Sequence, residues 1–119
     1  MWIYSLKGFV SVVQHEDDSN RVVIRARLKA DVEGFKEMFE SMGLKTSEIA
    51  VTTKADYKYR FVADRADWIS VMTKLMQDVK YTNFKDAVYK SDTRAMRDKR
   101  HDVYLDIWSV SRRLQNLDK

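Results

Sequence analysis

Four basic side chains with a regular spacing are the residues of this sequence best suited to chemistry. Arg25 and Arg27 alternate with apolar residues in one predicted strand, and Lys58 and Arg60 alternate with aromatic residues in another. A guanidinium offers a planar fork of N–H donors that fits phosphate oxygens, and an ammonium adds a compact positive charge. If the two strands are neighbours, the four cations gather on one face of a sheet. The chemistry they offer is binding of an anion, which we interpret as nucleic acid or a nucleotide.

Three further residues suggest a polar pocket beside these cations: His15, Asp56 and Tyr57. With Arg60, the histidine and the aspartate are the groups that a small hydrolase or nucleotide-processing enzyme would hold within hydrogen-bond reach. The sequence contains neither a Gly-rich phosphate loop nor a nucleophile elbow. We therefore keep the enzyme as an alternative and favour a non-enzymatic binding module. For Tyr57 we favour packing in the core together with Tyr59.

The sequence predicts no metal site and no cofactor. It has no cysteine, which excludes disulfides and thiolate zinc sites. The two histidines do not have a recognised metal-ligand spacing. Asp98, Asp102 and Asp106 follow one another every four residues, a row that could hold a hard cation. Arg94 precedes the row by four residues and offsets its repulsion, so we favour a solvated, salt-bridged helix face.

Length and composition indicate one domain spanning residues 1–119, with an ordinary 45% of apolar residues. No secretory signal opens the chain, and no apolar run approaches the roughly 18 residues of a membrane span. We therefore expect a cytoplasmic protein without a membrane partner. The net charge is +4, and residues 80–119, with ten basic and six acidic side chains, carry the whole excess. Such a modest excess can steer an anionic partner.

Residues 22–29 show the clearest secondary-structure pattern, because apolar residues recur at every second position. Val22, Ile24, Ala26 and Leu28 are expected on the covered face of a sheet, and the odd-numbered residues 23–29 on the other face. Further strands are predicted at 9–14, 48–53 and 57–62. In the last of these, the aromatic residues share the face opposite Arg60. RNA-binding sheets expose aromatic residues, so this arrangement argues against an RNA-binding platform.

Helical spacing predicts the remaining elements. One helix is capped by Asp31 and ends at Gly43, a second begins after Asp64, and a short third follows Thr82. A long terminal helix begins at Asp92 or Thr93. The order ββαββα plus a C-terminal helix predicts an α+β domain, a four-stranded antiparallel sheet with helices packed on one face. It fits a circularly permuted ferredoxin-like fold, in which the first, second, fourth and third strands are neighbours.

Several strings together resemble a family of small uncharacterised single-domain proteins from bacteria and bacteriophages, over the full length of the chain. These strings are residues 1–4, 8–13, 25–27, 56–60, 83–88 and 108–114. The family usually has Asp-Tyr before the string at 83–88, where this chain has Tyr81 and Thr82. The family has no established activity, so the resemblance transfers no functional residue. It implies a free-standing intracellular protein.

Two other interpretations of the surface stay open. The basic residues are also what an outer sheet face needs simply to remain soluble. Alternatively, the sheet face or an edge strand pairs with protein, which would make the chain a homo-oligomer or an inhibitor of another protein.

Overall fold

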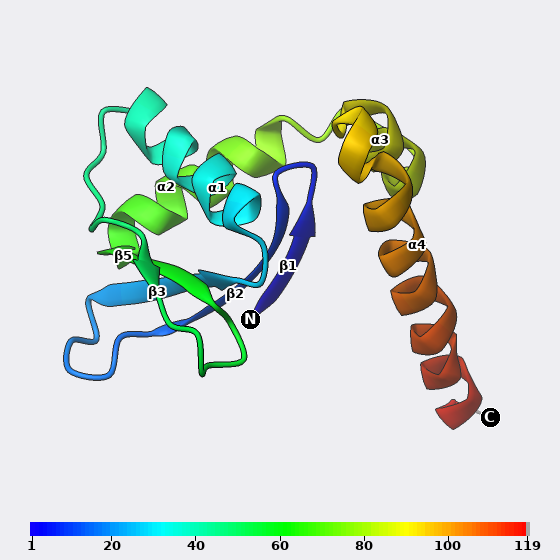
Figure 1. Ribbon diagram of the computed structural model, residues 1–119, viewed down its shortest axis with the longest axis horizontal. Coiled ribbons are helices and arrows are strands. Elements are labelled where there is room, and N and C mark those ends of the chain that lie inside the picture. Colours follow the sequence, from blue (N-terminus) through cyan, green and yellow to red (C-terminus); the bar gives the residue numbers. More distant parts are fainter. Residues whose placement is uncertain (119) are drawn as a thin grey trace. The chain divides into compact units, whose positions relative to one another are not determined.

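Five strands form one antiparallel sheet, and two helices lie on one side of it (Figure 1). The computed structural model describes residues 1–118, which fall into two compact units that meet between Lys80 and Tyr81. The first unit contains β1 (Trp2–Ser5), β2 (Gly8–Gln14), β3 (Arg21–Ala26), α1 (Lys29–Ser41), β4 (Ala50–Val51), β5 (Tyr59–Asp64) and α2 (Arg65–Gln77). The second contains α3 (Phe84–Ser91), α4 (Arg94–Ser111) and a 3₁₀ segment, η1 (Arg112–Leu117). The predicted α+β class is confirmed.

The sheet order is β1-β2-β3-β5-β4, with every neighbouring pair antiparallel. The four strands expected from the sequence are β2 to β5, and they are neighbours in the predicted order. The predicted count of four is wrong, because β1 is a fifth strand. Our prediction began the first strand at residue 9. Leu6 and Lys7 instead form a tight turn before β2, so the residues that precede the turn fold back and pair with β2.

Gly8 and Asp31 fix this turn. Gly8 has a φ of +122°, in the left-handed region that favours glycine. The backbone N–H of Phe9 donates to Oδ2 of Asp31 over 3.1 Å, and the Asp31 side chain is buried. The prediction that Asp31 caps α1 is wrong, since the helix begins at Lys29 and Asp31 lies within its first turn. The carboxylate thus links α1 to the β1–β2 hairpin.

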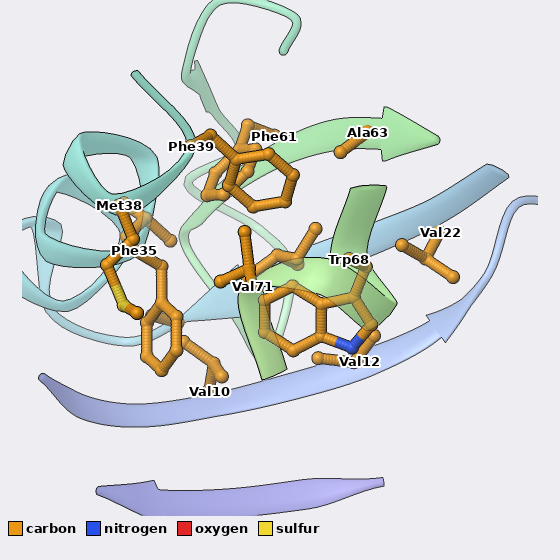
Figure 2. Packing of buried hydrophobic residues seen from close by; sticks show 13 residues of the cluster. Val10, Val12, Val22, Phe35, Met38, Phe39, Phe61, Ala63, Trp68 and Val71 are labelled. Atoms are coloured by element: carbon orange, nitrogen blue, oxygen red, sulfur yellow. The ribbon is translucent and has the colours of Figure 1, made fainter. Parts of the chain in front are cut away.

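The core lies between the sheet and its two helices, and Figure 2 shows how the side chains interdigitate. Val22, Ile24 and Ala26 are buried, so the predicted alternation is confirmed along β3. It does not extend to Leu28, which is 40% exposed because the strand ends at Ala26. From α1 and α2, the residues facing the sheet are Val32, Phe35, Met38, Phe39, Trp68 and Val71.

The C-terminus of α1 and the N-terminus of α4 are capped by residues that the sequence predicts for these roles. Gly43 has a φ of +70°, and its N–H donates to the carbonyl of Glu40 while that of Leu44 donates to Phe39. This is the hydrogen-bonding of a glycine C-cap. Thr93 caps α4 by accepting from the N–H of Met96, one of the two predicted starts. The expected cap at Thr82 is wrong, because the neighbouring Asn83 has this role for α3.

Residues 1–118 contain neither a candidate membrane span nor a candidate metal site. None of their helices combines the length and the apolar character needed to cross a bilayer. Within the same residues, no three His, Asp or Glu side chains gather closely enough to hold a metal ion, including the aspartates of α4.

Candidate functional site

The face of the sheet opposite α1 and α2, which we call the open face, carries the predicted arginines. Strand register puts one residue from each strand into a single row across this face. The row is Trp2, Ser11, Arg25, Arg60 and Ala50. Because side chains alternate along each strand, the neighbouring residues of β3 and β5, Ile24 and Phe61, point to the core instead.

Tyr57 is buried, as predicted, but it lies on the open face and not in the cluster between the sheet and its helices, so the predicted packing against the helices is wrong. The guanidinium carbons of Arg25 and Arg27 lie 4.7 and 4.9 Å from the centre of its ring. Arg60 donates from Nη2 to the Tyr57 carbonyl over 3.2 Å. The alternation of β5 begins only at Tyr59, which does pack against the core. Tyr57 precedes the strand, so the alternation of β5 does not determine the face on which its side chain lies.

Four aromatic residues meet on the open face: Trp2, Tyr4, Phe9 and Tyr57, which we call the aromatic cluster. The Tyr4 and Phe9 rings stack with centres 4.4 Å apart and planes at 6°. Phe9 contacts Trp2 and Tyr57 edge-to-face, over 6.1 and 6.3 Å. The predicted placement of aromatic residues opposite Arg60 is correct for Tyr59 and Phe61, but the open face does carry aromatic residues, so the interpretation against an RNA-binding platform loses its basis. The spacing of Trp2, Tyr4 and Phe9 predicts that these residues share one face, but only if β1 and β2 are recognised as a hairpin.

Arg25, Arg27 and Arg60 form the charged part of the site, and we call them the arginine cluster. Arg25 and Arg60 are direct cross-strand partners. Like charges at such positions repel. Arg25 donates from Nη2 to Oγ of the buried Ser11 over 2.8 Å, which fixes its guanidinium. Within residues 1–118, no ion pair joins any of the three to a carboxylate. The Nε atoms of Arg25 and Arg60 are buried without a hydrogen-bond partner.

Lys58 does not join the three arginines at Tyr57. Its Nζ lies 5.4 Å from the centre of the Tyr59 ring, which packs at the edge of the core. Of the four cations singled out in the sequence, the structure thus brings together three.

Tyr4 adds an electrostatic detail to the aromatic cluster. Burial raises the pKa of its phenol above the ordinary value of about 10, Tyr57 raises the pKa further, and Arg27 opposes both. The phenol is therefore neutral at physiological pH. It brings no negative charge that would compete with an anionic ligand for Arg27.

The predicted pocket of His15, Asp56 and Tyr57 is not assembled. The Nδ1 atom of His15 accepts from the N–H of Asp17 in the β2–β3 turn, at the Arg21 end of β3. Asp56 lies in the loop before β5, beyond the opposite end of β3. The backbone of β3 spans about 16 Å between these ends. His15 and Asp56 are thus too far apart for proton transfer through a hydrogen bond. The structure does not bring together the residues that the hydrolase hypothesis requires.

Comparison with protein-family models, with curated proteins and with solved structures finds no match. The resemblance to a family of small bacterial and bacteriophage proteins stays a prediction.

Proposed function

We propose that this protein is a non-enzymatic binding module whose open face engages an anionic partner, nucleic acid or a nucleotide. The observation that carries the proposal is the arginine cluster: two guanidiniums lie over the Tyr57 ring and a third donates to the Tyr57 carbonyl, with no carboxylate of the described chain paired to them. Arginines that only solubilise a surface would be expected to pair with nearby acids. An arriving phosphate relieves the repulsion between Arg25 and Arg60, which favours binding.

The fold supports the same proposal. The order of β2, β3, β5 and β4, with α1 and α2 on one side, is compatible with a circularly permuted ferredoxin-like fold to which β1 adds an edge strand. Sheets backed by helices present aromatic and basic residues to nucleic acid in RNA-binding modules. Here the aromatic cluster lies beside the arginine cluster on the open face, so the two kinds of contact are available together.

Binding of a labelled single-stranded oligonucleotide at several salt concentrations tests the proposal. Each neutralised phosphate of a single strand contributes about −0.7 to the slope of log affinity against log salt. With three arginines engaged, we expect a slope of about −2 in fluorescence anisotropy between about 50 and 200 mM salt.

A slope near zero would mean that the arginines do not contact phosphates. Failure of single-stranded RNA, single-stranded DNA, duplex DNA and mononucleotides to bind at the lowest salt would overturn the proposed function.

A second candidate function, self-association, is favoured by α4 and η1. Apolar residues recur there at intervals of four and three, the spacing of a coiled-coil seam: Val103, Ile107, Val110, Leu114 and Leu117. All are exposed except Ile107, which is half-buried.

Light scattering after size exclusion tests self-association. We expect a mass near twice the 14.1 kDa of one chain, and Val110→Glu should return the mass to one chain because it adds a charge to the seam. Leu105→Glu is the control, since Leu105 is exposed on the same helix but outside the seam. A wild-type mass of one chain, or a Val110→Glu variant that still pairs, contradicts this candidate.

A further inference from the structure

We propose that the ligand of the open face is single-stranded nucleic acid, with one base stacked on the indole of Trp2 and neighbouring phosphates on the arginine cluster. This inference rests on the proposed function and narrows it to one class of nucleic acid. Four features of the open face support it: the exposure of Trp2, its fixed backbone, the position of the arginines beside it, and the position of α1 and α2 on the other side of the sheet.

Trp2 is the stacking surface of the aromatic cluster. It is 67% exposed, whereas Tyr4, Phe9 and Tyr57 are half-buried or buried. Tyr4 and Phe9 stack on each other, and Tyr57 is occupied by two guanidiniums. Only Trp2 is therefore open enough to receive a base. Stacking of one base on an aromatic side chain changes affinity by about 5- to 150-fold and tolerates every base.

The backbone around Trp2 is already fixed. The Met1 nitrogen donates to the Val12 carbonyl over 2.8 Å, and the Val12 N–H donates back to the Met1 carbonyl over 2.8 Å. On the other side, Ile3 pairs with Val10. Trp2 is held in the ladder from both directions, so little conformational entropy is lost when a base stacks on it.

Two arginines follow Trp2 along the row. Ser11 is the cross-strand neighbour of both Trp2 and Arg25, and its hydroxyl accepts from the Arg25 guanidinium. Arg60 follows one strand further, at a spacing of about 4.8 Å. The cations thus lie at increasing distance from the stacking surface, as do successive phosphates of one strand. A single nucleotide would leave part of the arginine cluster unpaired.

The position of α1 and α2 argues against a duplex. Bases in a duplex are stacked on each other, and reading them requires a helix or a β-ribbon that enters a groove. The helices of the first unit, α1 and α2, lie on the other side of the sheet (Figure 1). An exposed indole on a sheet is suited to bases that are already unpaired.

Tryptophan fluorescence tests the inference in a Trp108→Phe background. Trp108 is exposed in the second unit and Trp68 is buried, so quenching in this background reports on Trp2. We expect a short oligothymidylate or oligouridylate to quench the emission, and duplex DNA and thymidine monophosphate to bind at least about tenfold more weakly. Trp2→Ala should lower oligonucleotide affinity by about 5- to 150-fold, and Trp2→Phe should restore most of it.

The outcomes separate this inference from the proposed function. If Trp2→Ala binds as tightly as its parent while loss of Arg25 and Arg27 abolishes binding, stacking is wrong and anion binding stands. If duplex DNA or the mononucleotide binds as tightly as the oligonucleotide, the assignment to single strands is wrong. If no nucleic acid or nucleotide binds at low salt, both proposals fail. Circular dichroism of each variant shows that the comparison is made between folded proteins.

Discussion

Gly8→Ala is expected to lower the free energy of unfolding by about 3 kcal/mol, from two costs at one position. The left-handed φ of +122° strains any residue with a Cβ. The new Cβ would also overlap the carboxyl group of Asp31. That carboxyl is buried and accepts from the N–H of Phe9, so it cannot move aside without loss of the hydrogen bond. Urea denaturation followed by circular dichroism measures the change.

Gly43→Ala provides a matched control. Gly43 also has a left-handed backbone, with a φ of +70°, but a Cβ there would meet no atom within 4 Å. Its cost should be about 1 kcal/mol, from strain alone. The difference between the two variants isolates the overlap with Asp31. Equal costs would show that the turn relaxes freely, and that Asp31 does not fix the β1–β2 hairpin. Because this hairpin brings Trp2 and Tyr4 to Phe9, Gly8→Ala should also weaken ligand binding.

The covered face of the sheet could be predicted because only every second residue of β3 is buried. A slip of one residue would move Val22, Ile24 and Ala26 from the core to solvent, so their alternation specifies both the strand and its face. Gly43 and Thr93 were predictable for a similar reason, since each satisfies backbone groups that a helix end leaves unpaired. These signals are local and strong.

The open face could be predicted only in part. Alternation in β3 correctly set Arg25 away from the core, and the predicted strand order correctly made Arg60 its neighbour. Tyr57 was assigned to the wrong face because alternation holds only while residues remain in the ladder, and β5 begins two residues later. Trp2 and Tyr4 were missed because the turn at Gly8 depends on the distant Asp31.

The pocket prediction failed for a different reason. His15 and Asp56 each follow or precede a predicted strand, but a sequence does not state which end of the sheet each loop occupies. In the antiparallel order found here, the β2–β3 turn and the loop before β5 lie at opposite ends of β3. Two residues chosen for their chemistry alone therefore need a topology before they can form a site.

Replacing both Arg25 and Arg27 with glutamine is expected to weaken oligonucleotide binding by about 100-fold or more. Each charge-assisted hydrogen bond to a phosphate contributes about 1.5–3 kcal/mol, and every 1.4 kcal/mol is about tenfold in affinity. The slope of log affinity against log salt should also become shallower by about 1.4, because two fewer phosphates are neutralised. Both changes can be read from one set of anisotropy titrations.

The fold of this double variant should persist, which makes the result interpretable. Glutamine at position 25 keeps a polar side chain beside Ser11, and loss of the Arg25 charge removes the repulsion with Arg60. Lys45→Gln with Lys74→Gln is the matched control: it removes the same charge from exposed positions, after α1 and on α2. Lys74 pairs with Asp78 at the surface, so its loss costs little stability. The control should retain nearly full affinity and the wild-type salt slope. If both double variants weaken binding equally, net charge rather than the arginine cluster attracts the ligand, and the open face is not the site.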